Sequence, residues 1–299
     1  MLPASGVLII KLAKTILSPT VEGNTNPKAV NADMTPEILQ EVLLGCVVGL
    51  MVGLTGAGGA ALAIPGMSLL LGVPAMTAVA TAFPFTSLTK VFAFLEHRRL
   101  GTIHWPVAKY YLIGTIPGTL AGVITLSHLY ERLGSALDFW LKLAIGLLLI
   151  LSVLFRLFQR RVAAGLAPDP PSVLTLFQKF LAVGVSAVLG VIIGATSVGG
   201  GSFLVISILI LFPIRTVKAV GTSVAVSLFL MIEGAIAYFG TGLMDIPMAV
   251  AMAGGAVPAA ILGSRMAKRV PEPKLGIIVS GAVLVAGGLL ILRLFPWVP

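Results

Sequence analysis

Long apolar runs recur along almost the whole chain and constrain its fold more than any other feature. Several of them approach or exceed the roughly 18 residues that mark a bilayer-spanning helix. Charged residues make up 10% of the 299 residues, whereas a soluble domain carries roughly 25%. The sequence therefore predicts an all-α, polytopic integral membrane protein that crosses the cell membrane several times.

The net charge of +9 comes from short clusters of Lys and Arg at the ends of apolar runs. In such positions these residues set the orientation of the helices and meet anionic lipid headgroups. We therefore expect membrane lipids as partners and no nucleic acid, and the sequence is compatible with a homo-oligomer. The single cysteine, Cys46, rules out an internal disulfide. No His, Cys and acidic residues have metal-ligand spacing, so we expect no metal and no cofactor.

The distribution of apolar runs divides the chain into four parts. Residues 1–36 are predicted to form an interfacial helix, over residues 1–17, followed by a polar loop. Membrane repeat 1 (37–161), a Pro-rich linker (162–174) and membrane repeat 2 (175–299) follow. The full spans are predicted at residues 74–96, 106–126, 139–158, 216–239, 246–266 and 275–294, with a loop at 127–138.

Two glycine-rich stretches interrupt apolar runs, Thr55-Gly56-Ala57-Gly58-Gly59 and Thr196-Ser197-Val198-Gly199-Gly200-Gly201. A continuous helix from residue 37 to 71 would exceed about 50 Å, against a hydrocarbon core of roughly 30 Å. We therefore expect two half-helices, residues 42–54 and 59–71, that fold back at the first stretch. Residues 180–195 and 200–212 are predicted to do the same at the second. Each stretch is the predicted tip of a hairpin of broken half-helices.

The second half of the chain repeats the first. Residues 53–122 align without a gap on residues 194–263, an offset of 141 positions (194 − 53), with Gly, Thr and Pro in register. The positive-inside rule places the basic clusters at 97–99, 156–161 and 265–269 on the inner side. The span at 74–96 then runs inward and its equivalent at 216–239 outward. The sequence thus predicts two inverted repeats of about five helical segments, the plan of many secondary transporters.

The two tips are predicted to enter from opposite faces, each about 20 Å deep, and to overlap near mid-membrane. Each begins a half-helix whose free N–H groups and dipole favour an anion. The alternative is that the glycines serve only close helix packing. The candidate substrate-binding residues of the tips and the nearby hydroxyls are Thr55, Gly56, Gly58, Gly59, Thr196, Ser197, Gly199, Gly200, Gly201, Thr222 and Ser223.

Two ionisable residues, Lys90 and Glu233, lie inside predicted spans. Intramembrane charges are costly and usually mark function. Lys90 is a candidate for holding an anionic substrate, and Glu233 for carrying a coupling proton. Two alternatives remain open: Lys90 snorkels to the cytoplasmic interface, and Glu233 makes a helix–helix hydrogen bond.

The two tips, the run Ala219-Val220-Gly221-Thr222-Ser223 and the spacing Gly-x-x-x-x-Pro at 101–106 and 242–247 resemble a known family. The resemblance, over roughly residues 38–295, is to the sulfite/organosulfonate exporters TauE/SafE of bacterial and plant membranes. The first repeat departs from the pattern, with Ala80-Thr81-Ala82 in place of Gly221-Thr222-Ser223. The resemblance implies export of sulfite, sulfoacetate or other organosulfonates, and we expect the bacterial inner membrane. The residues by themselves indicate only a small anion.

The functional interpretation is a secondary transporter that works by alternating access with proton coupling. An anion channel, or a transporter of another small organic anion, is the alternative. An intramembrane hydrolase would use Ser202, but His97, His104 and His128 fall at predicted helix ends or in loops, at the wrong depth for a Ser–His pair. We therefore expect no enzyme.

Overall fold

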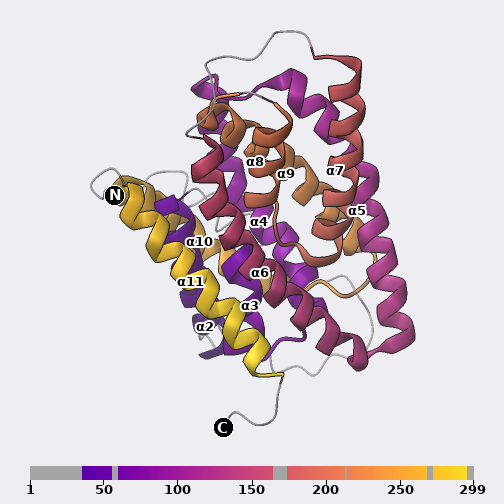
Figure 1. Cartoon of the computed structure of the whole chain (residues 1–299). Helices are drawn as coiled ribbons and strands as arrows, with labels where there is room; N and C mark the ends of the chain where they lie inside the picture. The colour runs from indigo at the N-terminus through magenta and orange to yellow at the C-terminus, as the bar shows by residue number, and fades with distance from the viewer. Residues whose placement is uncertain (1–35, 56–59, 164–173, 213, 268–271, 295–299) are drawn as a thin grey trace. The chain divides into compact units, whose positions relative to one another are not determined.

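The computed structural model describes residues 36–55, 60–163, 174–212, 214–267 and 272–294 (Figure 1). This part of the chain contains ten α-helices and no strand, which confirms the predicted all-helical membrane fold. Seven of these helices are long and apolar enough to cross a membrane. The helices are α2 (Pro36–Thr55), α3 (Ala60–Leu70), α4 (Ala75–Arg99), α5 (Trp105–Leu133), α6 (Ser135–Ala163), α7 (Leu176–Thr196), α8 (Ser202–Leu211), α9 (Thr216–Phe239), α10 (Ile246–Ala267) and α11 (Glu272–Leu292).

Both glycine-rich stretches separate two helices, as predicted, but the first helix of each pair is longer than the predicted half-helix, with 20 residues in α2 and 21 in α7. The short helices α3 and α8 have 11 and 10 residues. At 1.5 Å per residue they extend about 15–17 Å, roughly half of a hydrocarbon core. They are therefore half-helices, and the long partners are α2 and α7.

The predicted loop at 127–138 is wrong. Helix α5 continues to Leu133, and α6 begins at Ser135 after a turn at Gly134, whose φ is 53°. The prediction followed hydropathy, which falls after Leu126. Hydropathy marks where an apolar run ends, but helical hydrogen bonding continues through polar residues until a helix-stopping residue such as glycine.

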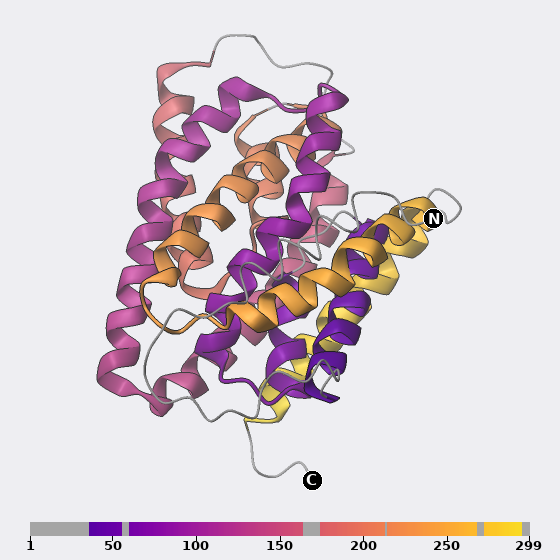
Figure 2. The same cartoon turned by 180° about the vertical axis from the view of Figure 1, so that it is seen from behind.

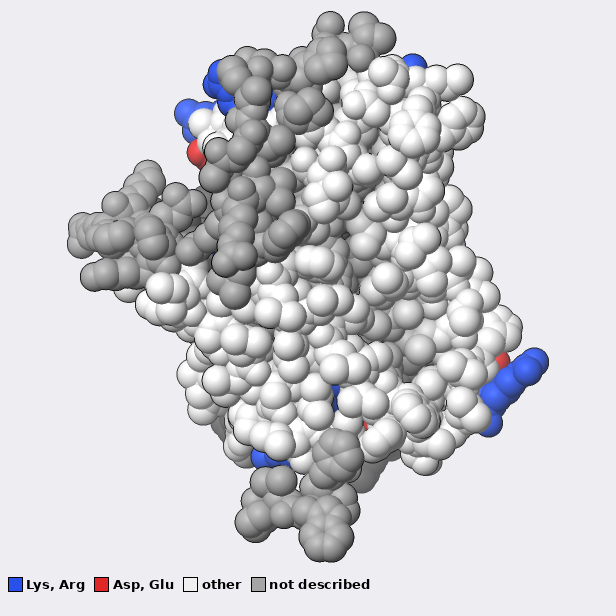
Figure 3. All heavy atoms as spheres, viewed as in Figure 1, with Lys and Arg blue, Asp and Glu red and all other residues white. Residues whose placement is uncertain are grey.

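The equivalent helices α4 and α9 lie at the centre of the bundle (Figures 1 and 2). In an apolar stretch of 18 residues taken from each helix, 61% of the residues are buried in α4 and 67% in α9, compared with 22% in α2 and in α7. Charged side chains on the face in Figure 3 gather toward two opposite ends and leave a wide uncharged band between them. Such a band is the surface expected of helices that face lipid.

Glycines allow the long helix of each hairpin to pack against a helix of the other half. A Cβ atom at Gly118 or Gly122 in α5 would collide with the carbonyl oxygen of Ala187 or Val191 in α7. In the same way, Gly45, Gly49 and Gly53 of α2 lie against the backbone of Met252, Ala256 and Ala260 of α10. Residue numbers rise together along both pairs, so the paired helices run parallel. Much of the glycine in these helices therefore serves close packing.

These contacts occur twice, with the halves exchanged. Gly53 of α2 meets Ala260 of α10, and Gly194 of α7 meets Thr119 of α5. The second contact is the first one transformed by the offset of 141 positions (53 + 141 = 194; 119 + 141 = 260). Such reciprocal exchange is expected of two units related by a two-fold axis, and the inverted relation of the repeats stays a prediction.

The equivalent helices α4 and α9 contact each other directly. Phe83 of α4 is a neighbour of Gly234 in α9, and Lys90 is a neighbour of Ser227. Residue numbers rise along α4 as they fall along α9, so these helices pack antiparallel.

The structure describes most of the two predicted membrane repeats but little of the predicted N-terminal part and linker. By its packing the chain divides into residues 1–39 and residues 40–299, so nearly all of both repeats belongs to one unit. The predicted interfacial helix at 1–17, its polar loop and most of the linker at 162–174 lie outside the described residues. The four-part division therefore stays a prediction.

Candidate functional site

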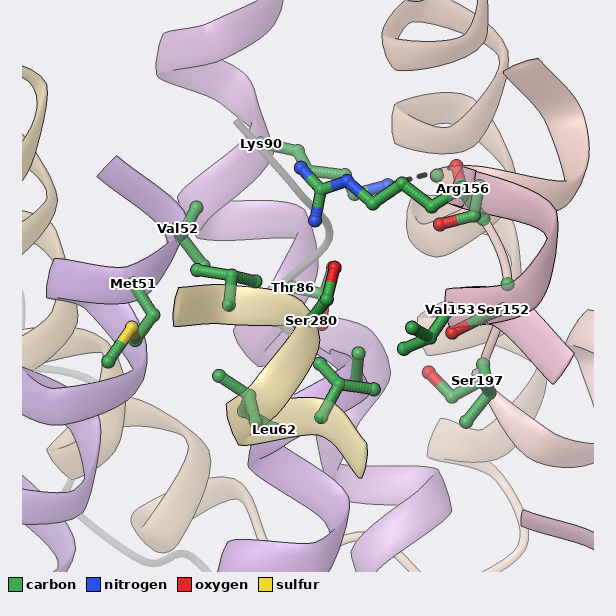
Figure 4. Close-up of a pocket in the computed structure, with 18 of the residues that line it drawn as sticks. Met51, Val52, Leu62, Thr86, Lys90, Ser152, Val153, Arg156, Ser197 and Ser280 are labelled. Atoms are coloured by element: carbon green, nitrogen blue, oxygen red, sulfur yellow. Dashed lines mark hydrogen bonds between the residues drawn. The ribbon is translucent and has the colours of Figure 1, made fainter. Parts of the chain in front are cut away.

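A cavity of about 50 Å³ lies beside the turn between α7 and α8 (Figure 4). Pockets for drug-sized molecules are usually about 300–1,000 Å³, so this cavity has the scale of a small ion. Its lining comes from both hairpins and from α4, α6, α9 and α11. Among the described residues that line it, Lys90 and Arg156 are charged and none is acidic.

The second predicted tip forms one wall of this cavity. Helix α7 ends at Thr196, after which Ser197 adopts a left-handed conformation with φ of 54°, and Gly199 has φ of 96°. These values turn the chain back so that α8 begins at Ser202. The first turn of a helix has N–H groups without intrahelical acceptors and carries the positive end of the helix dipole. Ser197 and residues 199–202 all line the cavity.

Lys90 joins this tip to the central helices. Its ammonium group donates a 2.6 Å hydrogen bond to Ser227 Oγ in α9 and lies 3.4 Å from the carbonyl oxygen of Gly200. The Lys90 residue is only 6% exposed. In Figure 4 its side chain extends into the cavity from α4. The charge is thus held beside the tip and away from the surface.

The repeat explains why a hydroxyl in the cavity lacks a partner. By the offset of 141, Lys90 corresponds to Met231, and Ser227 corresponds to Thr86. The Lys90–Ser227 hydrogen bond therefore has no counterpart, because Met231 carries a weakly polar sulfur in place of an ammonium group. Thr86 Oγ1 is buried without a hydrogen-bond partner, and Thr86 and Met231 both line the cavity. A ligand with an acceptor atom would satisfy the Thr86 hydroxyl.

Arg156 is a cavity residue that sequence reasoning missed. The sequence places it in a basic cluster that marks the inner side of the membrane. In the structure it lines the cavity together with Ser152. These two residues are four positions apart and therefore share one face of α6. A hydroxyl residue and a cation four positions apart, near the end of an apolar run, were the sequence signal that could have identified this face of α6 as part of the cavity.

The first predicted tip is only partly described. Thr55 is the last residue of α2, and Gly56, Gly58 and Gly59 lie outside the described residues. Met51 and Val52 of α2, with Ala61 and Leu62 of α3, line the cavity. The two arms of the first hairpin thus reach the same cavity as the second tip.

Three predicted hydroxyl residues do not line this cavity. Thr196 Oγ1 donates to the carbonyl oxygen of Ile192, and Ser223 Oγ to that of Val220. Thr222 Oγ1 accepts a 2.9 Å hydrogen bond from the backbone N–H of His104, and Thr81 Oγ1 makes the equivalent 3.0 Å contact with Asp245. Thr222 therefore helps to hold the start of α5, as its counterpart Thr81 does for α10.

Glu233 also lies outside the cavity lining. Both of its carboxylate oxygens are buried without a hydrogen-bond partner. A buried carboxylate without a partner is costly when ionised. The adjacent residue, Gly234, packs against Phe83 of α4.

The hydrolase alternative receives no geometric support in the described part of the chain. Ser202 lines the cavity, but no histidine there accompanies it. His104 instead caps α5 by accepting from the N–H of Val107. Burial, and then the charge of Lys218, lowers the pKa of His104 below its ordinary value. The described residues also contain no group of three side chains suited to a metal ion.

Comparison with known proteins decides the family. The family described as "Sulfite exporter TauE/SafE" matches residues 42–290, which is most of the chain. The chain belongs to the TauE/SafE family. It is 34% identical over 250 residues to "Probable membrane transporter protein YjnA" of Bacillus subtilis (strain 168), a match covering 82% of this chain and 96% of the relative.

Two further relatives carry the same kind of name. Identity is 26% over 252 residues to "Probable membrane transporter protein YdhB" of Bacillus subtilis (strain 168), covering 84% of this chain and 98% of the relative. The chain is 28% identical over 233 residues to a "Probable membrane transporter protein" of Xylella fastidiosa (strain 9a5c), a match covering 77% of this chain and 85% of the relative. No solved structure gives a significant match. This TauE/SafE protein is thus a multi-pass membrane transporter.

Proposed function

We propose that this protein is a secondary transporter that exports small sulfur-containing oxyanions, such as sulfite, sulfoacetate or other organosulfonates. The observation that carries the proposal is the position of Lys90, a buried cation beside the start of α8 in a cavity of ion size. A cation and a helix N-terminus together favour an anion. The volume of about 50 Å³ favours the smaller members of this class.

In the proposed site, the anion lies between Lys90, the Thr86 hydroxyl and backbone N–H groups of the second tip. Thr55, Gly56, Gly58 and Gly59 of the first tip stay predicted members of the binding set. The arms of that hairpin support this arrangement because they line the same cavity. Thr196, Thr222 and Ser223 are left out of the proposed binding set because their hydroxyls serve the backbone.

Alternating access follows in this proposal from inverted repeats that rock around the anion. Support comes from the antiparallel packing of the equivalent helices α4 and α9 and from the exchanged contacts between the halves. The Lys90–Ser227 hydrogen bond connects those two central helices. Binding of an anion to Lys90 would compete with this bond and loosen one link between the halves.

Glu233 is the proposed carrier of a coupling proton. Both oxygens of its carboxylate are buried without a hydrogen-bond partner among the described residues, and the adjacent Gly234 packs against Phe83 of α4. Gain or loss of a proton there changes the electrostatic cost of the contact between the halves. This location would couple protonation to the rocking motion without contact between the proton and the anion.

Proteoliposomes loaded with labelled sulfite test the proposal. An imposed pH gradient is expected to drive movement against the sulfite gradient, and Glu233→Gln is expected to retain exchange of sulfite for sulfite while it loses the response to pH. Strictly downhill flux that ignores the pH gradient would indicate an anion channel. A protein that moves neither sulfite nor sulfonates would contradict the proposal itself.

A further inference from the structure

A second hollow, the α5 groove, lies along the first half of α5 and shares no lining residue with the cavity beside the second tip. Its volume of about 740 Å³ is typical of a site for an organic molecule. Trp105, Lys109, Ile113 and Ile116 line it and recur every three or four positions, so they share one face of the helix. Among the described residues of its lining, Lys109 is charged and none is acidic.

The α5 groove changes in polarity along the helix. Trp105 and Lys109 lie in the first two turns of α5, whereas Ile113 and Ile116 lie further along. From Trp105 to Ile116 the helix rises about 16 Å, which is close to half of a hydrocarbon core of roughly 30 Å. The groove therefore has the length of one leaflet, with a cation at one end and branched aliphatic side chains at the other. A phospholipid has the same order of headgroup and acyl chain.

The polar end of the groove lies at the predicted inner face of the membrane. Trp105 follows closely on the basic residues at 97–99, which the positive-inside rule assigns to that face. The Trp105 ring packs edge-on against Phe94 of α4, with 6.5 Å between the ring centroids. Trp and Tyr are enriched at the level of the lipid headgroups. The end of the groove that carries Lys109 is thus the end that meets headgroups.

Lys179 of α7 supplies a second cation at this end. Helices α5 and α7 lie side by side (Figures 1 and 2), and Lys179 Nζ is 5.6 Å from the centroid of the Tyr110 ring, a cation–π contact. Tyr110 lines the groove and follows Lys109 in the sequence. Two lysines from different helices therefore flank the headgroup end. Basic side chains at the inner face attract negatively charged lipids.

We propose that the α5 groove binds one anionic phospholipid, with its headgroup at Lys109 and Lys179 and an acyl chain along Ile113 and Ile116. Helix α5 belongs to the first predicted repeat and α7 to the second, so this lipid contacts a helix from each half. The proposal is independent of the anion cavity, because the two sites have no residue in common.

Native mass spectrometry of the purified full chain tests the site with dioleoylphosphatidylglycerol and dioleoylphosphatidylcholine, which share acyl chains and differ in headgroup charge. The wild type is expected to bind the anionic lipid roughly tenfold more tightly or better, since each lysine near a headgroup adds about fivefold. Lys109→Gln/Lys179→Gln is expected to lose most of this preference and to keep its affinity for the phosphatidylcholine within about twofold. Glycerol 3-phosphate is expected not to displace the anionic lipid, and displacement would assign the lysines to a free phosphate and overturn the proposal.

Arg98→Gln/Arg99→Gln is the matched control, because it removes two charges from exposed residues at the same end of the bundle, outside the groove. It is expected to keep the wild-type preference. An equal loss in both double variants would show diffuse attraction and overturn the proposal. Equal binding of both lipids by the wild type would also overturn it, and a dimer lost in Ile113→Glu would then assign the groove to a second copy of the chain. If the lysine double variant does not fold, Lys109→Gln alone, expected to lose roughly fivefold, is compared with Arg98→Gln in the same way.

Discussion

The Lys90 ammonium group and the Ser227 hydroxyl are 2.6 Å apart and join the two central helices of different halves. By the offset of the repeat, their counterparts are Met231 and Thr86, which cannot form the same bond. A nearly symmetric scaffold therefore holds one strong cation at its centre, on one side only. In the proposed anion site, this difference between the halves places the Lys90 charge beside the second tip.

Lys90→Gln is expected to lower anion affinity by roughly tenfold or more, because the cation beside the second tip is lost while a hydrogen bond to Ser227 remains available. Isothermal titration with sulfite measures the change. Lys109→Gln, which removes an exposed cation of α5, is the control. Equal affinity in wild type and Lys90→Gln would exclude Lys90 from the site.

Thr86→Val is expected to weaken anion binding by roughly three- to tenfold, the effect of one lost hydrogen bond. Folding stability should not fall, because the hydroxyl has no partner in the protein. Thr119→Val is a matched control, since Thr119 Oγ1 is also buried without a partner but does not line the cavity. If both variants bind the anion equally well, the Thr86 hydroxyl does not contact it.

Gly200→Leu is expected to abolish transport while the protein still inserts and folds. A Cβ at this position would lie 3.0 Å from Met231 Cε and 3.6 Å from Lys90 Nζ, so a larger side chain fills the space for the anion. Flux and size-exclusion chromatography are measured together. Gly254→Leu on α10 provides the comparison, because nothing lies within 4 Å of a Cβ added there. Wild-type flux in Gly200→Leu would refute this site.

Acidification is expected to lower stability through His104, whose pKa is lowered mainly by burial and then by Lys218. Because folding lowers this pKa, the associated stability is fully present above the ordinary value of about 6.5 and is lost as the pH falls below it. Protonation also removes the acceptor that caps the N–H of Val107. The melting temperature measured at about pH 7.5 and about pH 5.5 should fall less in His104→Asp than in wild type.

His104→Asp copies the other half, in which Asp245 caps α10 by accepting from the N–H of Met248. His128→Asn, a change at an exposed histidine, should leave the wild-type response to pH in place. An unchanged pH response in His104→Asp would assign the loss of stability to another group.

The helices were predictable because their causes are local. Apolar length defines the spans, and the glycines at 199–201 break the run where α7 and α8 meet. The all-helical class is confirmed, and α3 and α8 are short helices as predicted. The predicted half-helices at 42–54 and 180–195 are parts of the longer helices α2 and α7, and the loop at 127–138 was wrong, because hydropathy does not report where a helix begins or ends. The repeat was also visible, since identical residues in register need no knowledge of packing.

Side-chain direction was decided by tertiary structure. Thr222 and Ser227 are hydroxyl residues on the same helix, yet Thr222 accepts from the His104 backbone and Ser227 accepts from Lys90. Arg156 belongs to a basic cluster that the sequence marks as a topology signal, but in the structure it lines the cavity. The apolar length and the glycine breaks, which depend on neighbouring residues, determined which segments cross the membrane and where they fold back. The rotation of each helix, fixed by backbone contacts between the two halves, decided which polar groups converge on one small cavity.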